Sequence, residues 1–189
     1  LKGHLGALAH GQVTTGVIKI AGIGASALAA SALVGSKATS VSGKVADLVL
    51  NTVLIAGTAN LANLLDLRPG RALKATVLVA TPLSYFSCAA AKAPASGASG
   101  AASAMPAASG AVASETPAAP ASASGASAQR LLASGLNAAA ITALVEDLQE
   151  TTMLGDTGAN AAGALLGTSL AANDSWKLRL GATLGVVGL

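Results

Sequence analysis

The feature that most constrains this chain is a series of apolar runs, each long enough to cross a lipid bilayer. Residues 17–35 form the first run, which as a helix would be roughly 28 Å long, close to the thickness of the hydrocarbon core. Similar runs cover 45–65 and 72–91. Only 10% of the residues are charged, against about 25% in average soluble domains. The sequence therefore predicts an all-α fold, a polytopic transmembrane helical bundle to which this chain contributes five to six membrane segments.

The order of these runs divides the chain into three regions. Residues 1–91 are predicted to hold transmembrane helices 1–3, with Pro82 as a kink in the third. Residues 92–129 lack Leu and Ile and consist mainly of Ala, Ser, Gly and Pro, which predicts a low-complexity loop. Residues 130–189 are predicted to hold helices 4–6, the first over 130–145. Because the chain starts at a Leu and ends inside an apolar run, we expect it to be a fragment of a longer membrane protein.

Composition also excludes several function classes. The net charge is +3, but the cations are scattered between apolar runs and aromatic residues make up only 2% of the chain, so we expect no nucleic-acid partner. His4 and His10 are six residues apart and do not share a helix face, which disfavours a metal pair. The single Cys88 cannot form an intrachain disulfide. Membrane lipid is the partner that this composition predicts.

A polar stripe closes the second apolar run. Asn60, Asn63 and Asp66 follow one another at intervals of three residues and so share an arc of about 120° on a helix. Pro69-Gly70 then ends the helix, and Arg68 lies beside that break. Polar side chains next to cations at the end of a membrane helix indicate a site for an anionic ligand. The alternative is that the Asn residues only join this helix to a neighbour.

Two charged residues at the starts of other runs belong to the same prediction. If every run crosses the membrane once, Lys19, the polar stripe and Asp156 lie at one face and the long loop at the other. Lys19 is then either an interfacial lysine or a cation facing a phosphate. Asp156 is either a helix N-cap or, because Gly155 and Gly158 flank its motif, a ligand-binding carboxylate. Asp66 and Asp156 together suit Mg²⁺ that bridges diphosphate oxygens.

Three motifs carry a resemblance to a known family. They are Gly3-His-Leu-Gly-Ala-Leu followed by Thr14-Thr-Gly-Val-Ile-Lys19, then Asn60-Leu-Ala-Asn-Leu-Leu-Asp66, and Leu154-Gly-Asp-Thr-Gly158. In this order they resemble the polyprenyl-phosphate N-acetylhexosamine-1-phosphate transferase family, which includes the phospho-N-acetylmuramoyl-pentapeptide transferases. The resemblance covers nearly the whole chain except the 92–129 insert. The Ala-rich composition is similar to that of sequences from high-GC actinobacteria.

The resemblance implies an activity: Mg²⁺-dependent transfer of a sugar-1-phosphate from a UDP-linked amino sugar to a polyprenyl phosphate in cell-envelope glycan synthesis. It implies a multi-pass protein of the cytoplasmic membrane and leaves a homodimer open. Asp66 and Asp156 would be catalytic, and Asp156 would also be the metal ligand for Mg²⁺. The residues expected to bind substrate are Lys19, Asn60, Asn63 and Arg68.

The chain also departs from the family pattern. The family's Asp-Asp pair would lie upstream of Leu1, its His-rich loop would lie beyond Leu189, and Leu67-Arg-Pro-Gly70 replaces its second loop aspartate. We therefore expect this chain alone to be inactive. An alternative function is that of a catalytically degenerate homologue acting as a membrane scaffold or as a lipid-carrier or flippase partner. A secondary transporter would instead predict broken helices at the midplane and an internal repeat.

Overall fold

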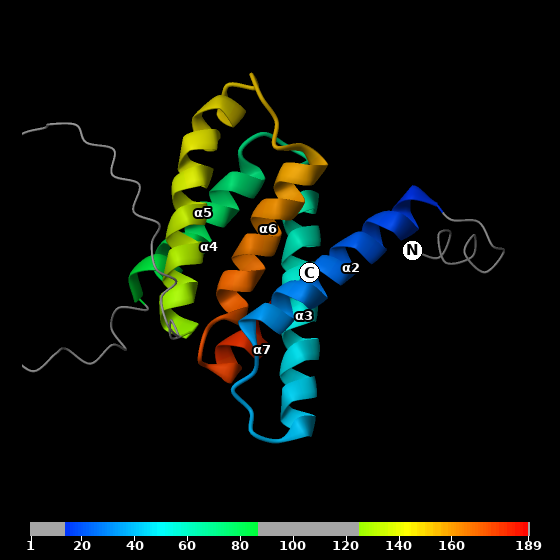
Figure 1. The fold of residues 1–189 in the computed structure, drawn as a ribbon. Helices are drawn as coiled ribbons and strands as arrows, with labels where there is room; N and C mark the ends of the chain where they lie inside the picture. Colours follow the sequence, from blue (N-terminus) through cyan, green and yellow to red (C-terminus); the bar gives the residue numbers. More distant parts are fainter. Residues whose placement is uncertain (1–13, 87–124, 189) are drawn as a thin grey trace, which may run out of the picture.

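The computed structural model describes residues 14–86 and 125–188, and within these residues it contains helices and no strand (Figure 1). The predicted all-α fold is confirmed. The helices are α2 (Thr15–Val34), α3 (Val41–Leu65), α4 (Arg71–Phe86), α5 (Gly125–Leu148), α6 (Gly155–Ala171) and α7 (Trp176–Val187).

Successive helices run in alternating directions, which gives the bundle two ends (Figure 1). The α3–α4 and α5–α6 turns form one end, which we call the Asp66 end. The α2–α3 and α6–α7 turns, with the start of α5, form the opposite end, which we call the Arg179 end. Helix α2 crosses the others obliquely, and its N-terminal end projects away from them (Figure 1).

The contact between α3 and α6 is the centre of the bundle, and small residues make it close. A Cβ atom added at Gly163 would lie 2.4 Å from the Thr58 carbonyl oxygen. One added at Gly167 would lie 2.7 Å from the Ile55 Cα. Only glycine allows the two backbones to approach this closely, which is how helices associate in lipid, where burial of apolar surface gives little driving force.

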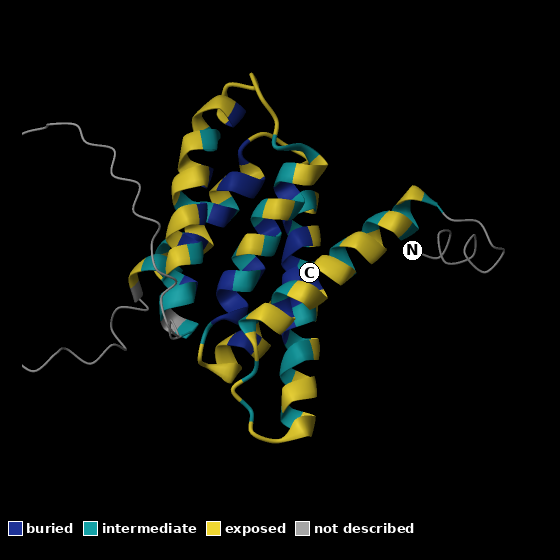
Figure 2. Ribbon diagram, viewed as in Figure 1, coloured by how far each residue is buried: buried dark blue, intermediate teal, exposed yellow. Residues whose placement is uncertain are grey.

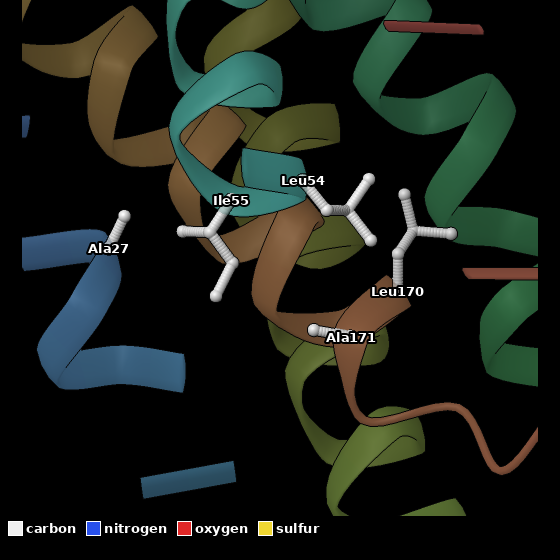
Figure 3. Close-up of a cluster of buried hydrophobic side chains, with 5 residues drawn as sticks. All are labelled: Ala27, Leu54, Ile55, Leu170 and Ala171. Carbon is white, nitrogen blue, oxygen red and sulfur yellow. The ribbon is translucent and has the colours of Figure 1, made fainter. Parts of the chain in front are cut away.

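A small apolar core lies on either side of this contact. Leu54 and Leu170 lie beside one another, and Ala27 of α2 faces Ile55 (Figure 3). Buried residues are concentrated on α3 and α6, whereas the outward surfaces of α2 and α5 are exposed (Figure 2). Many exposed side chains are large and apolar, including Ile18, Leu33, Leu131 and Leu184. Such a surface suits lipid rather than water as its surroundings.

Three of the described helices are long and apolar enough to cross a membrane: Thr15–Val34, Val41–Leu65 and Ser127–Leu148. The chain is therefore described as a helical membrane protein. The predicted five to six segments exceed this number, because α4, α6 and α7 are shorter. The 16 residues of α4 span only about 24 Å against a core of about 30 Å. Helix α4 continues through Pro82, where the sequence indicated a kink.

The predicted border between the low-complexity loop and the next helix was wrong by five residues. Residues 125–129 belong to α5, not to the loop, while 92–124 lie outside the described residues, as do His4, His10 and Cys88. The early start of α5 has a tertiary cause. Gln129 is buried, its backbone carbonyl accepts a hydrogen bond from Ser169, and its side-chain carbonyl accepts one from Asn173. These contacts outweigh the weak helix propensity of this Gly/Ser-rich stretch.

Candidate functional site

Lys19 and Asp156 meet at the Asp66 end although 137 residues separate them in sequence. The Lys19 Nζ lies 3.1 Å from the Asp156 Oδ2, with 36% and 75% of the two side chains exposed. Asp156 is in the first turn of α6, whose N-cap is Leu154 and has no side-chain cap hydrogen bond. The N-cap alternative for Asp156 is therefore wrong. Its charge is favoured by the N-terminal dipole of α6 while its oxygens stay accessible.

Asp66 lies directly after α3 and faces the start of α6. Its carboxylate accepts a backbone hydrogen bond from Gly155. Gly155 has a φ of 63°, in the left-handed region that favours glycine. The glycine is thus required by the backbone conformation that directs its N–H toward Asp66. In this way the α5–α6 turn joins α3 at the site.

A second carboxylate joins the same two turns in the opposite direction, from α5 to the α3–α4 turn. Asp147, near the end of α5, is buried, and its Oδ2 accepts a hydrogen bond of 2.5 Å from the Gly70 N–H. Gly70 also has a positive φ, 73°, and a Cβ there would lie 2.5 Å from the Leu148 Cδ2. The sequence analysis did not identify Asp147 as part of this site. The one local signal was the Pro69-Gly70 turn, which provides the donor.

The electrostatics of this end favour a cation. Burial raises the pKa of Asp66 above its ordinary value, and the negative charges of Asp147 and then Asp156 raise it further. The hydrogen bond from Gly155 acts in the opposite direction and only partly offsets this effect. Three carboxylates therefore share a region in which Lys19 is the cation paired with one of them. A bound cation would relieve this repulsion.

The other residues predicted to bind substrate differ in how far they are exposed. Asn60 and Arg68 are exposed, whereas Asn63 is half-buried and its Oδ1 has no hydrogen-bond partner among the described residues. Asn160 of α6 resembles Asn63 in this respect: its Oδ1 is buried without a partner, while its Nδ2 donates to the Asp156 carbonyl oxygen at 2.6 Å. The sequence analysis missed Asn160, although it lies four residues after Asp156 and so on the same helix face.

A groove of about 240 Å³ lies between α2, α3 and α6. Gly22 and Ile23 line it from α2, and Asn160 and Ala161 line it from α6. These residues follow Lys19 and Asp156 by about one helical turn. The groove therefore starts next to the Lys19–Asp156 pair and continues along a mostly apolar surface. A second pocket, of about 380 Å³, lies at the Arg179 end.

No group of three or more His, Cys, Asp or Glu residues is placed to hold a metal ion within 14–86 and 125–188. This excludes, for these residues, an all-protein cage. Mg²⁺ commonly binds to one or two carboxylates and completes its shell with water and substrate phosphates. Asp66 and Asp156 offer oxygen donors of the right kind and an excess of negative charge. They fit a Mg²⁺ ion that arrives with a phosphate ligand.

Comparison of the chain with protein-family models, with curated proteins and with solved structures found no match. The support for a function therefore comes from the motifs and from the geometry of the Asp66 end.

Proposed function

We propose that this chain takes part in Mg²⁺-dependent transfer of a sugar-1-phosphate from a UDP-linked amino sugar to a polyprenyl phosphate at the cytoplasmic membrane. The observation that supports this proposal most is the ion pair of Lys19 with Asp156 at the end of an apolar bundle where Asp66 also lies, close enough for the Asp156 charge to act on its pKa. Three helices in the described part of the bundle are long and apolar enough to cross a membrane, which is where a polyprenyl substrate would also lie.

In this reaction a phosphate oxygen of the polyprenyl phosphate attacks the β-phosphorus of the UDP-sugar, and UMP leaves. Such transfers depend mainly on positioning and on neutralising charge at the moving oxygens. Lys19 would bind a phosphate oxygen, and Asp156 would hold Mg²⁺ with the diphosphate. Mg²⁺ would supply the positive charge that stabilises the leaving UMP. Asp66, with its raised pKa, would accept and hold a proton from the attacking phosphate.

Two further features agree with the substrates. The apolar groove beside Lys19 offers a surface for the first isoprene units of the lipid acceptor. The Oδ1 atoms of Asn63 and Asn160 are acceptors that lack a donor in the described part of the chain. Hydroxyl groups of a sugar or the imide N–H of uracil would satisfy them.

The test is Asp156→Asn in the protein with its natural flanking sequence. We expect Mg²⁺-dependent exchange of labelled UMP into the UDP-sugar to fall by a factor of at least about 100, because the metal loses its charged ligand. Thermal unfolding should stay close to that of the unmodified protein, since the Asp156 side chain is 75% exposed. Asp174→Asn, the same change at an exposed aspartate of the Arg179 end, is the matched control and should keep full exchange.

Lys19→Ala tests the cation separately. We expect it to raise KM for the UDP-sugar about tenfold with a smaller change in kcat, because it removes a phosphate contact. Near-normal exchange in Asp156→Asn would contradict the assigned metal ligand. If the unmodified protein is stably inserted yet shows no exchange with any polyprenyl phosphate, the degenerate scaffold or flippase partner becomes the better interpretation.

A further inference from the structure

A pocket of about 380 Å³ lies at the Arg179 end and plays no part in the proposed reaction. Its walls are mainly apolar, with Leu33 and Val34 from α2 and Leu132 from α5. Its polar side chains include two cations, Lys37 and Arg179. The volume falls within the range of about 300–1,000 Å³ that is usual for ligand sites.

Arg179 is held rigidly at this pocket but is not saturated. Its side chain is buried, Nη1 donates to the Asn51 Oδ1 at 3.0 Å, and Nη2 donates to the Asp47 Oδ1 at 3.0 Å. The other carboxylate oxygen of Asp47 accepts a hydrogen bond of 2.7 Å from the Ser36 hydroxyl. The Arg179 Nε is buried and has no hydrogen-bond partner among the described residues. Because this nitrogen is almost wholly inaccessible, Arg179 contributes a fixed positive charge to the pocket wall rather than a hydrogen-bond donor for a ligand.

Lys37 supplies a second, movable cation. It forms an ion pair with Asp174, and 57% of each side chain is exposed. An ion pair this open to water is weak, so Lys37 can exchange Asp174 for another anion at little cost. Arg179 therefore provides a fixed positive charge and Lys37 an adaptable hydrogen-bond donor on the same pocket.

The pocket also lies at the depth of lipid headgroups. Leu33 and Val34 are the last residues of the candidate span Thr15–Val34, and Ala128, which lines the opposite wall, is at the start of the span Ser127–Leu148. The pocket thus lies where two spans leave the hydrocarbon layer, with cations above apolar walls.

We propose that this pocket binds an anionic phospholipid of the leaflet opposite the Asp66 end. The lipid phosphate replaces Asp174 as the partner of Lys37, close to the fixed positive charge of Arg179, and the first part of an acyl chain lies against Leu33, Val34 and Leu132. The proposal rests on charge complementarity and depth in the membrane, and it is independent of the proposed sugar-phosphate transfer.

Native mass spectrometry of the purified protein with dioleoylphosphatidylglycerol or dioleoylphosphatidylcholine tests this proposal. We expect specific retention of the phosphatidylglycerol. Lys37→Ala should weaken that binding about fivefold, the effect of one basic residue at an anionic lipid surface. Lys177→Ala, which removes an exposed cation that does not line the pocket, is the matched control and should leave binding unchanged.

A second variant changes the volume of the pocket and leaves its charges unchanged. Ala128→Leu adds apolar volume to the pocket wall and keeps Arg179 with all its partners, and we expect it to reduce phosphatidylglycerol binding at least as much as Lys37→Ala does. Equal retention of both lipids, or equal effects of Lys37→Ala and Lys177→Ala, would overturn the proposal. If inorganic phosphate stabilised the protein against heat as much as phosphatidylglycerol does, the phosphate group would come from free phosphate and not from a lipid, and the proposal would be wrong. Asp66→Asn should not change lipid binding, which separates this result from the test of the transfer reaction.

Discussion

The two ends of the bundle contain ion pairs of nearly equal length in very different surroundings. Lys19 and Asp156 are 3.1 Å apart, with 36% and 75% of their side chains exposed. Arg179 and Asp47 are 3.0 Å apart, with only 7% and 16% exposed. Water screens the first pair, so it adds little to stability and its groups remain available to a ligand. The second pair is desolvated, and it holds α7 against α3 as long as both partners are present.

The balance of charge differs between the ends as well. At the Arg179 end, Asp47 and Asp174 each pair with a cation. At the Asp66 end, burial and then repulsion from neighbouring carboxylates raise the pKa of Asp66, and two glycines in left-handed conformations direct backbone N–H groups at carboxylates. At the Arg179 end the buried Arg179–Asp47 pair is a structural anchor beside the exposed and exchangeable Lys37–Asp174 pair, whereas the closely spaced carboxylates of the Asp66 end indicate a cation site.

The largest expected effect comes from breaking the buried pair. Arg179→Met should lower the free energy of unfolding by about 3–5 kcal/mol, because it leaves the Asp47 carboxylate without its cation. Unfolding in detergent micelles, followed by circular dichroism, measures this change. The double variant Asp47→Leu/Arg179→Met removes both charges and should recover most of the loss. If Arg179→Met has no more effect than Lys19→Ala, the contrast between the two ends is wrong.

A smaller effect is expected at the α3–α6 contact, which joins the two ends. Gly163→Ala should lower stability by about 1–3 kcal/mol, because the new Cβ meets the Thr58 carbonyl oxygen and the Ala59 Cα, which are backbone atoms. Gly185→Ala in α7 is the matched control, since no atom lies within 4 Å of its added Cβ. It should be neutral or stabilising by up to about 1 kcal/mol. Equal losses from both changes would mean that α3 and α6 adjust freely to one another.

The sequence predicted the helices whose signals are local. The apolar runs at 17–35 and 45–65 correspond to α2 and α3, and the starts of those helices coincide with good capping residues. Thr14 accepts a hydrogen bond from the Val17 N–H, and Ser40 accepts one from the Gly43 N–H. Alternating crossings also predicted that Lys19 and Asp156 lie at one face, and in the structure they form an ion pair.

The buried polar contacts could not be predicted in the same way. Asp47 and Arg179 are 132 residues apart, and their pairing depends on how α3 and α7 rotate about their own axes. Asp147 sits among other acidic residues in the sequence, and only the position of Gly70 distinguishes it. Helix periodicity specifies a face within one helix and leaves open which neighbour that face meets. These residues were therefore accessible only from the tertiary structure.

The smallest expected effect concerns how the stability of the Asp66 end depends on pH. Since the pKa of Asp66 is raised in the folded state above its ordinary value of 3.8, the folded protein binds this proton more tightly than the unfolded chain. The contribution of Asp66 to stability is therefore fully present below its unfolded pKa of 3.8 and is lost as the pH rises through the raised pKa.

Asp66→Asn removes that titration. We expect it to raise the free energy of unfolding at pH 7.5 slightly, by less than about 1 kcal/mol because the site is open to screening, and to bring no gain below pH 3.8. Glu150→Gln, which removes an exposed charge of the same end, serves as control and should change the free energy of unfolding by no more than about 0.5 kcal/mol at either pH. A lower Tm at pH 7.5 would mean that the hydrogen bond from Gly155 dominates and that Asp66 is structural. A variant that is more stable yet inactive in UMP exchange would show that the chain keeps this carboxylate at a cost to stability, as expected of a ligand site.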